Sequence, residues 1–165
     1  MHRAFAPDRI DGETLGRLAW AAGKAPMGGA ELVRRIIVVA DPALVTTVRQ
    51  VTPSFLANAS AIIVICTDLE RAEAAMGRQG RDILSLLDSG AAAENVALAA
   101  PALGLGVSFV RSANDAALRE VLELPEQVRP DILIGVGRPA ATPSPSVRAP
   151  EPVVFRDRYG SAWAP

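Results

Sequence analysis

Few residues in this chain carry side chains of the kinds that usually perform catalysis. The sequence has one cysteine, Cys66, and one histidine, His2. Cys66 stands in the apolar run AIIVICTD, which predicts a buried structural thiol rather than a nucleophile. His2 lies at a terminus that we expect to be mobile. The sequence therefore offers neither a Cys/His zinc site nor a Ser-His-Asp triad, and any difficult chemistry would belong to a cofactor.

Other polar residues with chemical potential lie in the stretch DSGAAAENVALAAPALGLG, residues 88–106. Glu94 and Asn95 interrupt a run of small apolar residues. They form either a buried polar site or satisfied groups where helices pack, and the many alanines favour the second interpretation. The corner Gly104-Leu105-Gly106 lacks the third glycine of a dinucleotide loop and follows a helix instead of a strand. Its glycines therefore predict a close approach of some other group to the backbone.

A pair of arginines, Arg34 and Arg35, stands at the start of a β-branched run. The pair forms either an anion-binding patch or, as we prefer, a solvent-facing strand edge. The formal net charge of the whole chain is -1, so no long-range field attracts nucleic acid or an anionic membrane. We see no apolar run of membrane-spanning length and no signal peptide, and we expect a cytoplasmic protein.

The elements that must position these residues alternate between helices and strands. The 165 residues suggest one domain, and 50% hydrophobic content suggests a well-filled core. Residues 68–80 predict a short helix or a mobile segment. Periodicity and caps predict helices over 12–23, 42–50, 82–103 and 116–122. Apolar runs predict strands over 34–40, 60–67, 106–110, 131–137 and 151–155, with Pro152 confining the last to an edge. These elements indicate an α+β or α/β layered sheet flanked by helices.

Several pieces, taken in order, resemble the nitroreductase superfamily of FMN enzymes. They are Arg3-Ala4-Phe5, APMGG, IIVVADP, ASAIIVICTD, DSGAAAENVALAAPALGLG, LPEQVRPDILIGVGRPA and SVRAPEPVVF. The resemblance implies an α+β fold with a central mixed or antiparallel sheet flanked by helices. It also implies an intertwined homodimer centred on a small-residue helix at 88–103. Residues 1–165 would form a single domain, with 139–165 as an extended C-terminal arm. Within that arm, we expect 151–155 to add a strand to the partner's sheet.

The resemblance also implies a set of FMN-binding residues. Two arginines, Arg3 and Arg148, match positions that hold the FMN phosphate, and a guanidinium suits a phosphate bidentately. The glycine corner would lie beside the flavin. The backbone that follows the corner, at Val110, Arg111 and Ser112, would face the flavin N5 edge. The loop after the first helix would contact the ring through its backbone amides, at Met27, Gly28, Gly29 and Ala30. The family's polar or tryptophan side chains in this loop are replaced here, by Met27, Ala30, Leu32 and Arg34.

By this resemblance, the chain is an FMN-dependent oxidoreductase. It would transfer hydride through flavin N5 between NAD(P)H and a small organic acceptor, or act as a dehydrogenase or oxidase. No side chain need act as acid or base. A further partner subunit is possible, because small members that oxidise cyclic dipeptides alongside a partner also look similar. The altered loop supports an alternative, in which the chain is a degenerate, non-catalytic subunit that binds another ligand or a protein.

Overall fold

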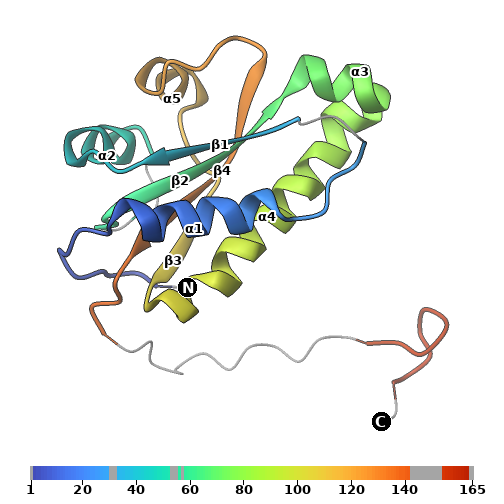
Figure 1. Cartoon of the computed structure of the whole chain (residues 1–165). Helices are drawn as coiled ribbons and strands as arrows, with labels where there is room; N and C mark the ends of the chain where they lie inside the picture. Colours follow the sequence, from blue (N-terminus) through green and yellow to red (C-terminus); the bar gives the residue numbers. More distant parts are fainter. Residues whose placement is uncertain (1, 30–32, 53–55, 57, 142–153, 164–165) are drawn as a thin grey trace.

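A four-stranded antiparallel sheet forms the centre of the fold in the computed structural model, which describes residues 2–29, 33–52, 56, 58–141 and 154–163 (Figure 1). The strand order is β1-β2-β4-β3, so β1 and β3 are the edges. All three pairings are antiparallel, which confirms the α+β class and removes the mixed-sheet alternative. The strands are β1 (Arg34–Val39), β2 (Ala61–Asp68), β3 (Gly106–Val110) and β4 (Val128–Gly137).

Helices cover both faces of this sheet. The α-helices are α1 (Gly12–Gly23), α2 (Pro42–Gln50), α3 (Leu69–Gln79), α4 (Ser85–Ala99) and α5 (Asp115–Val121). Helices α1 and α4 pack on one face, and α2 and α5 pack on the other (Figure 1). Several helices begin where an Asp or Asn side chain accepts a hydrogen bond from the helix backbone, as Asp11 does from Thr14 N–H at 2.8 Å.

Strand β2 separates two hydrophobic cores. Its eight residues are all buried, as expected for an inner strand. Because side chains alternate along a strand, Ile63 and Ile65 face α1 and α4, whereas Ile62, Val64 and Cys66 face α2 and α5. Asn95 is satisfied at the first interface, where its Nδ2 donates to the Ala21 carbonyl at the end of α1 (3.0 Å). This contact confirms the interpretation of Asn95 as a group satisfied where helices pack.

The central helix α4 buries some of its small residues in the core, whereas Gly90 is exposed. Ala92, Ala93 and Val96 are buried in the core shared with α1 and the sheet. The expectation that these small residues line a subunit interface is therefore wrong for this side of the helix. Leu87 and Leu98, on the other side, are 65% and 69% exposed, so the outward surface of α4 carries the larger apolar side chains.

The predicted helix over 82–103 is divided into three parts. A π-helix, Gly80–Leu84, precedes α4, and a 3-10 turn, Pro101–Leu103, follows it. Proline cannot donate to the preceding turn, which explains why the α-helix stops at Ala99. The segment 68–80, expected as a short helix or a mobile region, contains α3.

The helical run Leu69–Leu103 is also the one candidate for a membrane span among the described residues, by length and composition alone. This contradicts the expectation that no apolar run reaches spanning length. The run is interrupted at Gly77, where φ is 68° and ψ is -170°, and the inward side of α4 packs on the sheet.

The predicted C-terminal strand at 151–155 falls largely outside the described residues. Within the described part, Phe155 forms an isolated bridge with Ala162 and packs its ring against Tyr159, with centroids 4.7 Å apart. Arg156 lies over the Trp163 ring. Residues 154–163 therefore form a small aromatic turn, which the sequence analysis did not anticipate.

Candidate functional site

The predicted cofactor-binding residues lie in three separate places. Arg3 lies in the N-terminal segment beside the start of β3 and the end of β4. Met27, Gly28 and Gly29 lie in the loop between α1 and β1, near the start of α4. Val110, Arg111 and Ser112 lie at the opposite end of β3. Ala30 and Arg148, also predicted as ligands, fall outside the described residues. The described residues of this set therefore belong to three different segments of the chain.

The N-terminal segment is held against the glycine corner. His2 N–H donates to the Val107 carbonyl at 2.9 Å, and Phe5 forms a bridge with Pro139. A Cβ at Gly106 would lie 2.4 Å from the His2 ring, and one at Gly137 would lie 2.6 Å from the Phe5 ring. The close approach predicted at the corner is thus made by the chain's own His2. This contact also fixes the exposed Arg3 between two anchored residues.

The loop after α1 is tied to α4 by two charged side chains. The Gly28 N–H donates to Asp88 Oδ2 at 2.8 Å. The guanidinium of Arg34 donates to the carbonyls of Ala22, Ala25, Pro26 and Asp88. Arg34 lies on the edge strand β1, as expected, but it is half-buried and its guanidinium is turned to backbone carbonyls instead of solvent. Arg35 instead forms an ion pair with Asp68, at 3.0 Å.

The third place is the end of β3. Val110 is buried in the core with α2 and α5 and pairs with Leu133 of β4. Arg111 is exposed and forms an ion pair with Asp115, with Nη1 and Oδ1 3.2 Å apart. Ser112 is exposed in the connection to α5. Any contact from Val110 must therefore be made by its backbone, whereas Arg111 and Ser112 also present accessible side chains.

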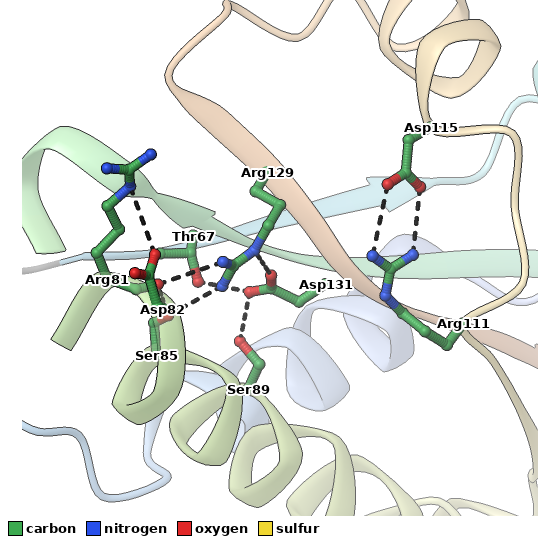
Figure 2. A network of polar contacts seen from close by, with 9 residues as sticks. All are labelled: Thr67, Arg81, Asp82, Ser85, Ser89, Arg111, Asp115, Arg129 and Asp131. Atoms are coloured by element: carbon green, nitrogen blue, oxygen red, sulfur yellow. Dashed lines mark hydrogen bonds and ion pairs between the residues drawn. The ribbon is translucent and has the colours of Figure 1, made fainter. Parts of the chain in front are cut away.

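A buried polar network that the sequence analysis missed joins the sheet to α4 (Figure 2). Asp131 Oδ2 accepts hydrogen bonds from Thr67 Oγ1 and from Ser89 Oγ, the latter at 2.7 Å. Its Oδ1 faces Arg129 Nε at 2.6 Å. Arg129 also donates to Ser85 Oγ. The one signal in the sequence was a carboxylate at the head of the apolar strand DILIGVG.

Burial makes Cys66 unreactive. It is fully enclosed in the core beneath α2 and α5, and this burial, together with the Asp131 carboxylate, raises the pKa of its thiol to about 12. A thiol that stays protonated at neutral pH is a poor nucleophile. The prediction of a buried structural cysteine is confirmed.

An apolar groove of about 690 Å³ runs between the outer side of α1 and the end of α4. Trp20, Leu103 and the small residues Ala99 and Ala102 line it, and Glu13 and Arg17 supply its charged groups. Trp20 is 66% exposed. Among the predicted cofactor residues that the structure describes, none lines this groove. It continues the exposed apolar side of α4 described above.

Comparisons with known proteins agree on one family. The family model described as "Nitroreductase family" matches residues 30–138. A relative from Archaeoglobus fulgidus, assigned as an NADH dehydrogenase/NAD(P)H nitroreductase, is 31% identical over 143 residues, covering 83% of this chain and 79% of the relative. An FMN reductase (NADPH) from Bacillus subtilis is 25% identical over 170 aligned residues, covering 94% of this chain and 68% of that protein.

A solved structure shows the same architecture. The crystal structure of a protein from Bacteroides thetaiotaomicron, assigned as an NADH dehydrogenase/NAD(P)H nitroreductase, superimposes with a TM-score of 0.79. The match covers 96% of this chain and 92% of that one, at 25% identity. The sheet and the helices on both of its faces are therefore shared over nearly the whole length of both chains.

Proposed function

Because this chain belongs to the nitroreductase family, we propose that it is an FMN-dependent oxidoreductase that uses NAD(P)H and acts on a small organic molecule. The observation that carries the proposal is the match to the Archaeoglobus fulgidus relative, at 31% identity over 83% of this chain. The match to an FMN reductase (NADPH) over 94% of the chain supports the same cofactors. Bound FMN would supply hydride transfer between the nicotinamide donor and the acceptor.

The groups available in this chain suit a flavin nucleotide. Arg3 provides an exposed guanidinium for the phosphate. Backbone amides of Met27 and Gly29, and those around Arg111 and Ser112, would serve the polar edges of the ring. A backbone donor in a folded segment is already oriented, so little reorganisation is required when charge develops on the ring. The Gly28 N–H already donates to Asp88, so it is not a donor for the ring. Gly28 would instead let the backbone approach the flavin ring closely, because it has no side chain.

The separation of these groups supports a site built by two chains. The loop at residues 27–29 lies near Asp88, whereas the N-terminal segment lies near Gly106. The helical stretch between Asp88 and Leu103 is about 22 Å long at a rise of about 1.5 Å per residue. A twofold axis across α4 would place the N-terminal end of this helix beside the C-terminal end of the same helix in the partner. Two equivalent flavin sites then arise, each completed by the other chain.

The outward side of α4 and the groove beside α1 supply the surface for this homodimer. Leu87, Leu98 and Trp20 are exposed apolar residues on these two neighbouring helices. Sedimentation should give a dimer at micromolar concentration, and Leu98→Arg should shift the protein to the 17.3 kDa monomer. Ala116→Arg, an exposed position on α5 across the sheet, is the matched control. A monomeric wild type would refute the dimer. Ala92→Arg is unsuitable as a test, because Ala92 lies in the core.

The arm at 139–165 would tie cofactor binding to this dimer. Its proline-rich sequence favours an extended chain, which would span the surface at about 3.1 Å per residue. Both β1 and β3 are edge strands of the described sheet, but His2 already donates to the Val107 carbonyl of β3. Strand β1 is therefore the better place for a further strand from the partner. Truncation after Ala149 should lower the thermal stability and the flavin content of the dimer. A truncated protein that matches the full chain in both would leave the arm without this role.

The decisive experiment is spectroscopic. Purified protein should show flavin absorption bands or gain them on adding FMN, and NADH or NADPH should bleach them. Arg148→Ala should weaken FMN binding about tenfold to a hundredfold, as expected for one charge-assisted phosphate contact. Arg158→Ala, an exposed arginine in the aromatic turn, should leave the affinity unchanged. Equal effects of the two variants would contradict the phosphate assignment.

A non-catalytic, degenerate subunit is the second candidate. The observations that favour it are the apolar Met27 in the loop and the engagement of the Gly28 N–H by Asp88. A colourless protein that does not bind added FMN would support this candidate, and co-purification with a second subunit would extend it.

We further propose a cytoplasmic location, where a lone thiol such as Cys66 stays reduced and reduced nicotinamides are available.

A further inference from the structure

The loop at residues 24–29 is held by one arginine that reaches four carbonyl oxygens. Arg34 Nη1 donates to Ala22 O at 2.9 Å and to Ala25 O at 3.3 Å. Its Nη2 donates to Pro26 O and to Asp88 O, both at 3.0 Å. A single guanidinium thus joins the end of α1, the loop and the start of α4.

A second set of contacts closes the loop from the other side. The Asp88 carboxylate accepts the Gly28 N–H at 2.8 Å. Met76 of α3 covers the two glycines so closely that a Cβ at Gly28 would lie 2.8 Å from its Sδ. Gly29 has a φ of +76°, which favours glycine. The path of the backbone through residues 27–29 is therefore determined by side chains outside the loop.

Arginine suits this role better than lysine would. Its planar fork presents several donors in a fixed geometry, and its charge lies at the C-terminal end of α1, where a cation is favoured. Burial lowers the pKa of the Arg34 guanidinium, while the nearby Asp88 carboxylate acts in the opposite direction. The four carbonyl contacts of Nη1 and Nη2 offset part of the cost of this burial, while Nε is buried without a hydrogen-bond partner among the described residues.

We propose that Arg34 and Asp88 are positioning residues that hold the backbone of residues 27–29 in the conformation that contacts FMN. This inference rests on the proposed function and deepens it. Because Met27 offers no polar side chain, the loop must contact the ring through its backbone, and a backbone site needs a fixed path. A ligand that meets a preordered loop avoids the entropy of ordering it. If the loop kept this path one-tenth of the time, apparent affinity would fall about tenfold.

The test compares Arg34→Met with Arg35→Met, its neighbour on the same strand. The first readout is hydrogen exchange at the Gly28 amide in FMN-free protein, measured by NMR. We expect Arg34→Met to accelerate exchange at least about tenfold beyond any global loss of stability, and Arg35→Met to leave it unchanged. The second readout is FMN affinity, together with the position of the bound flavin's absorption bands. Arg34→Met should weaken FMN binding about tenfold, and Arg35→Met less than about twofold.

Asp88 provides a second, independent route to the same loop if Arg34→Met does not fold. Asp88→Ala should expose the Gly28 amide to exchange and weaken FMN binding, whereas Asp88→Asn, which keeps an oxygen acceptor, should restore both. The double variant Arg34→Met/Asp88→Ala should lose less FMN-binding free energy than the sum of the losses in the two single variants, because both substitutions act on one loop. Unchanged Gly28 exchange in Arg34→Met or Asp88→Ala, or equal FMN affinity in the Arg34 and Arg35 variants, would overturn the inference. A wild type that binds no FMN would instead overturn the proposed function, while the exchange data still decide how the loop is held.

Discussion

Replacing Asp131 by Asn should reveal how strongly the buried network of Figure 2 holds α4 to the sheet. The Asp131 side chain is 1% exposed and that of its partner Arg129 is 20% exposed. The substitution removes the negative charge and leaves the Arg129 guanidinium without its buried counter-ion. It also leaves one oxygen acceptor for the hydroxyl groups of Thr67 and Ser89.

The size of the effect follows from this burial. Removing one partner of a buried ion pair costs about 3–5 kcal/mol. Arg129 keeps its hydrogen bonds to Ser85 Oγ and to the Arg81 carbonyl, so we expect the lower end of that range. A loss of about 3 kcal/mol in a chain of this length lowers Tm by about 6–12 °C.

The assay is thermal and urea denaturation at one protein concentration, with all variants either stripped of or saturated with FMN. Asp115→Asn is the matched control, because Asp115 and Arg111 form an exposed pair with side chains 47% and 52% accessible. An exposed pair four residues apart contributes about 0.3–0.5 kcal/mol, so the control should shift Tm by less than about 2 °C. If Asp131→Asn shifts Tm no more than the control does, the network does not hold α4 in place.

Three further predictions follow from single residues. Cys66 should resist thiol reagents at pH 8 in the folded protein and react at once in denaturant, because burial raises the pKa of its thiol to about 12; rapid labelling of the native state would contradict this. Gly77→Ala should destabilise the protein by about 1–3 kcal/mol, measured in urea, because a φ of 68° with a ψ of -170° is essentially restricted to glycine although no atom lies within 4 Å of the added Cβ. Hydrogen bonds from Thr14 lower the pKa of the Asp11 carboxyl below its ordinary 3.8. The ionised cap therefore stabilises α1 fully above pH 3.8, and this stabilisation is lost as the pH falls through the lowered pKa of the folded state. Asp11→Ala should accordingly lower Tm at pH 7 and show a smaller Tm difference from wild type at pH 2, and equal differences at both pH values would exclude the cap as the cause.

The local elements of this fold were predictable from the chain itself. Helix α1 begins after Asp11 and helix α2 begins after Asp41, with Pro42 as its first residue, as the caps indicated, because capping depends on residues only three positions apart. Strand β2 was predictable as an inner strand from its uninterrupted apolar run. The ordered motifs also predicted the family, which the comparisons confirmed.

The tertiary structure decided which partner each polar side chain meets. Asp131 meets Ser89 and Thr67, which lie 42 and 64 positions away, and Arg34 reaches Asp88 across 54 positions. No local pattern encodes such pairings. Which side of α4 packs on the sheet was ambiguous for a related reason. Its inward alanines and outward leucines are both apolar, so composition alone could not tell which side packs on the sheet. Only the packing of Ala92, Ala93 and Val96 against the strands settled that question, because close approach to a flat sheet favours the side with the smaller side chains.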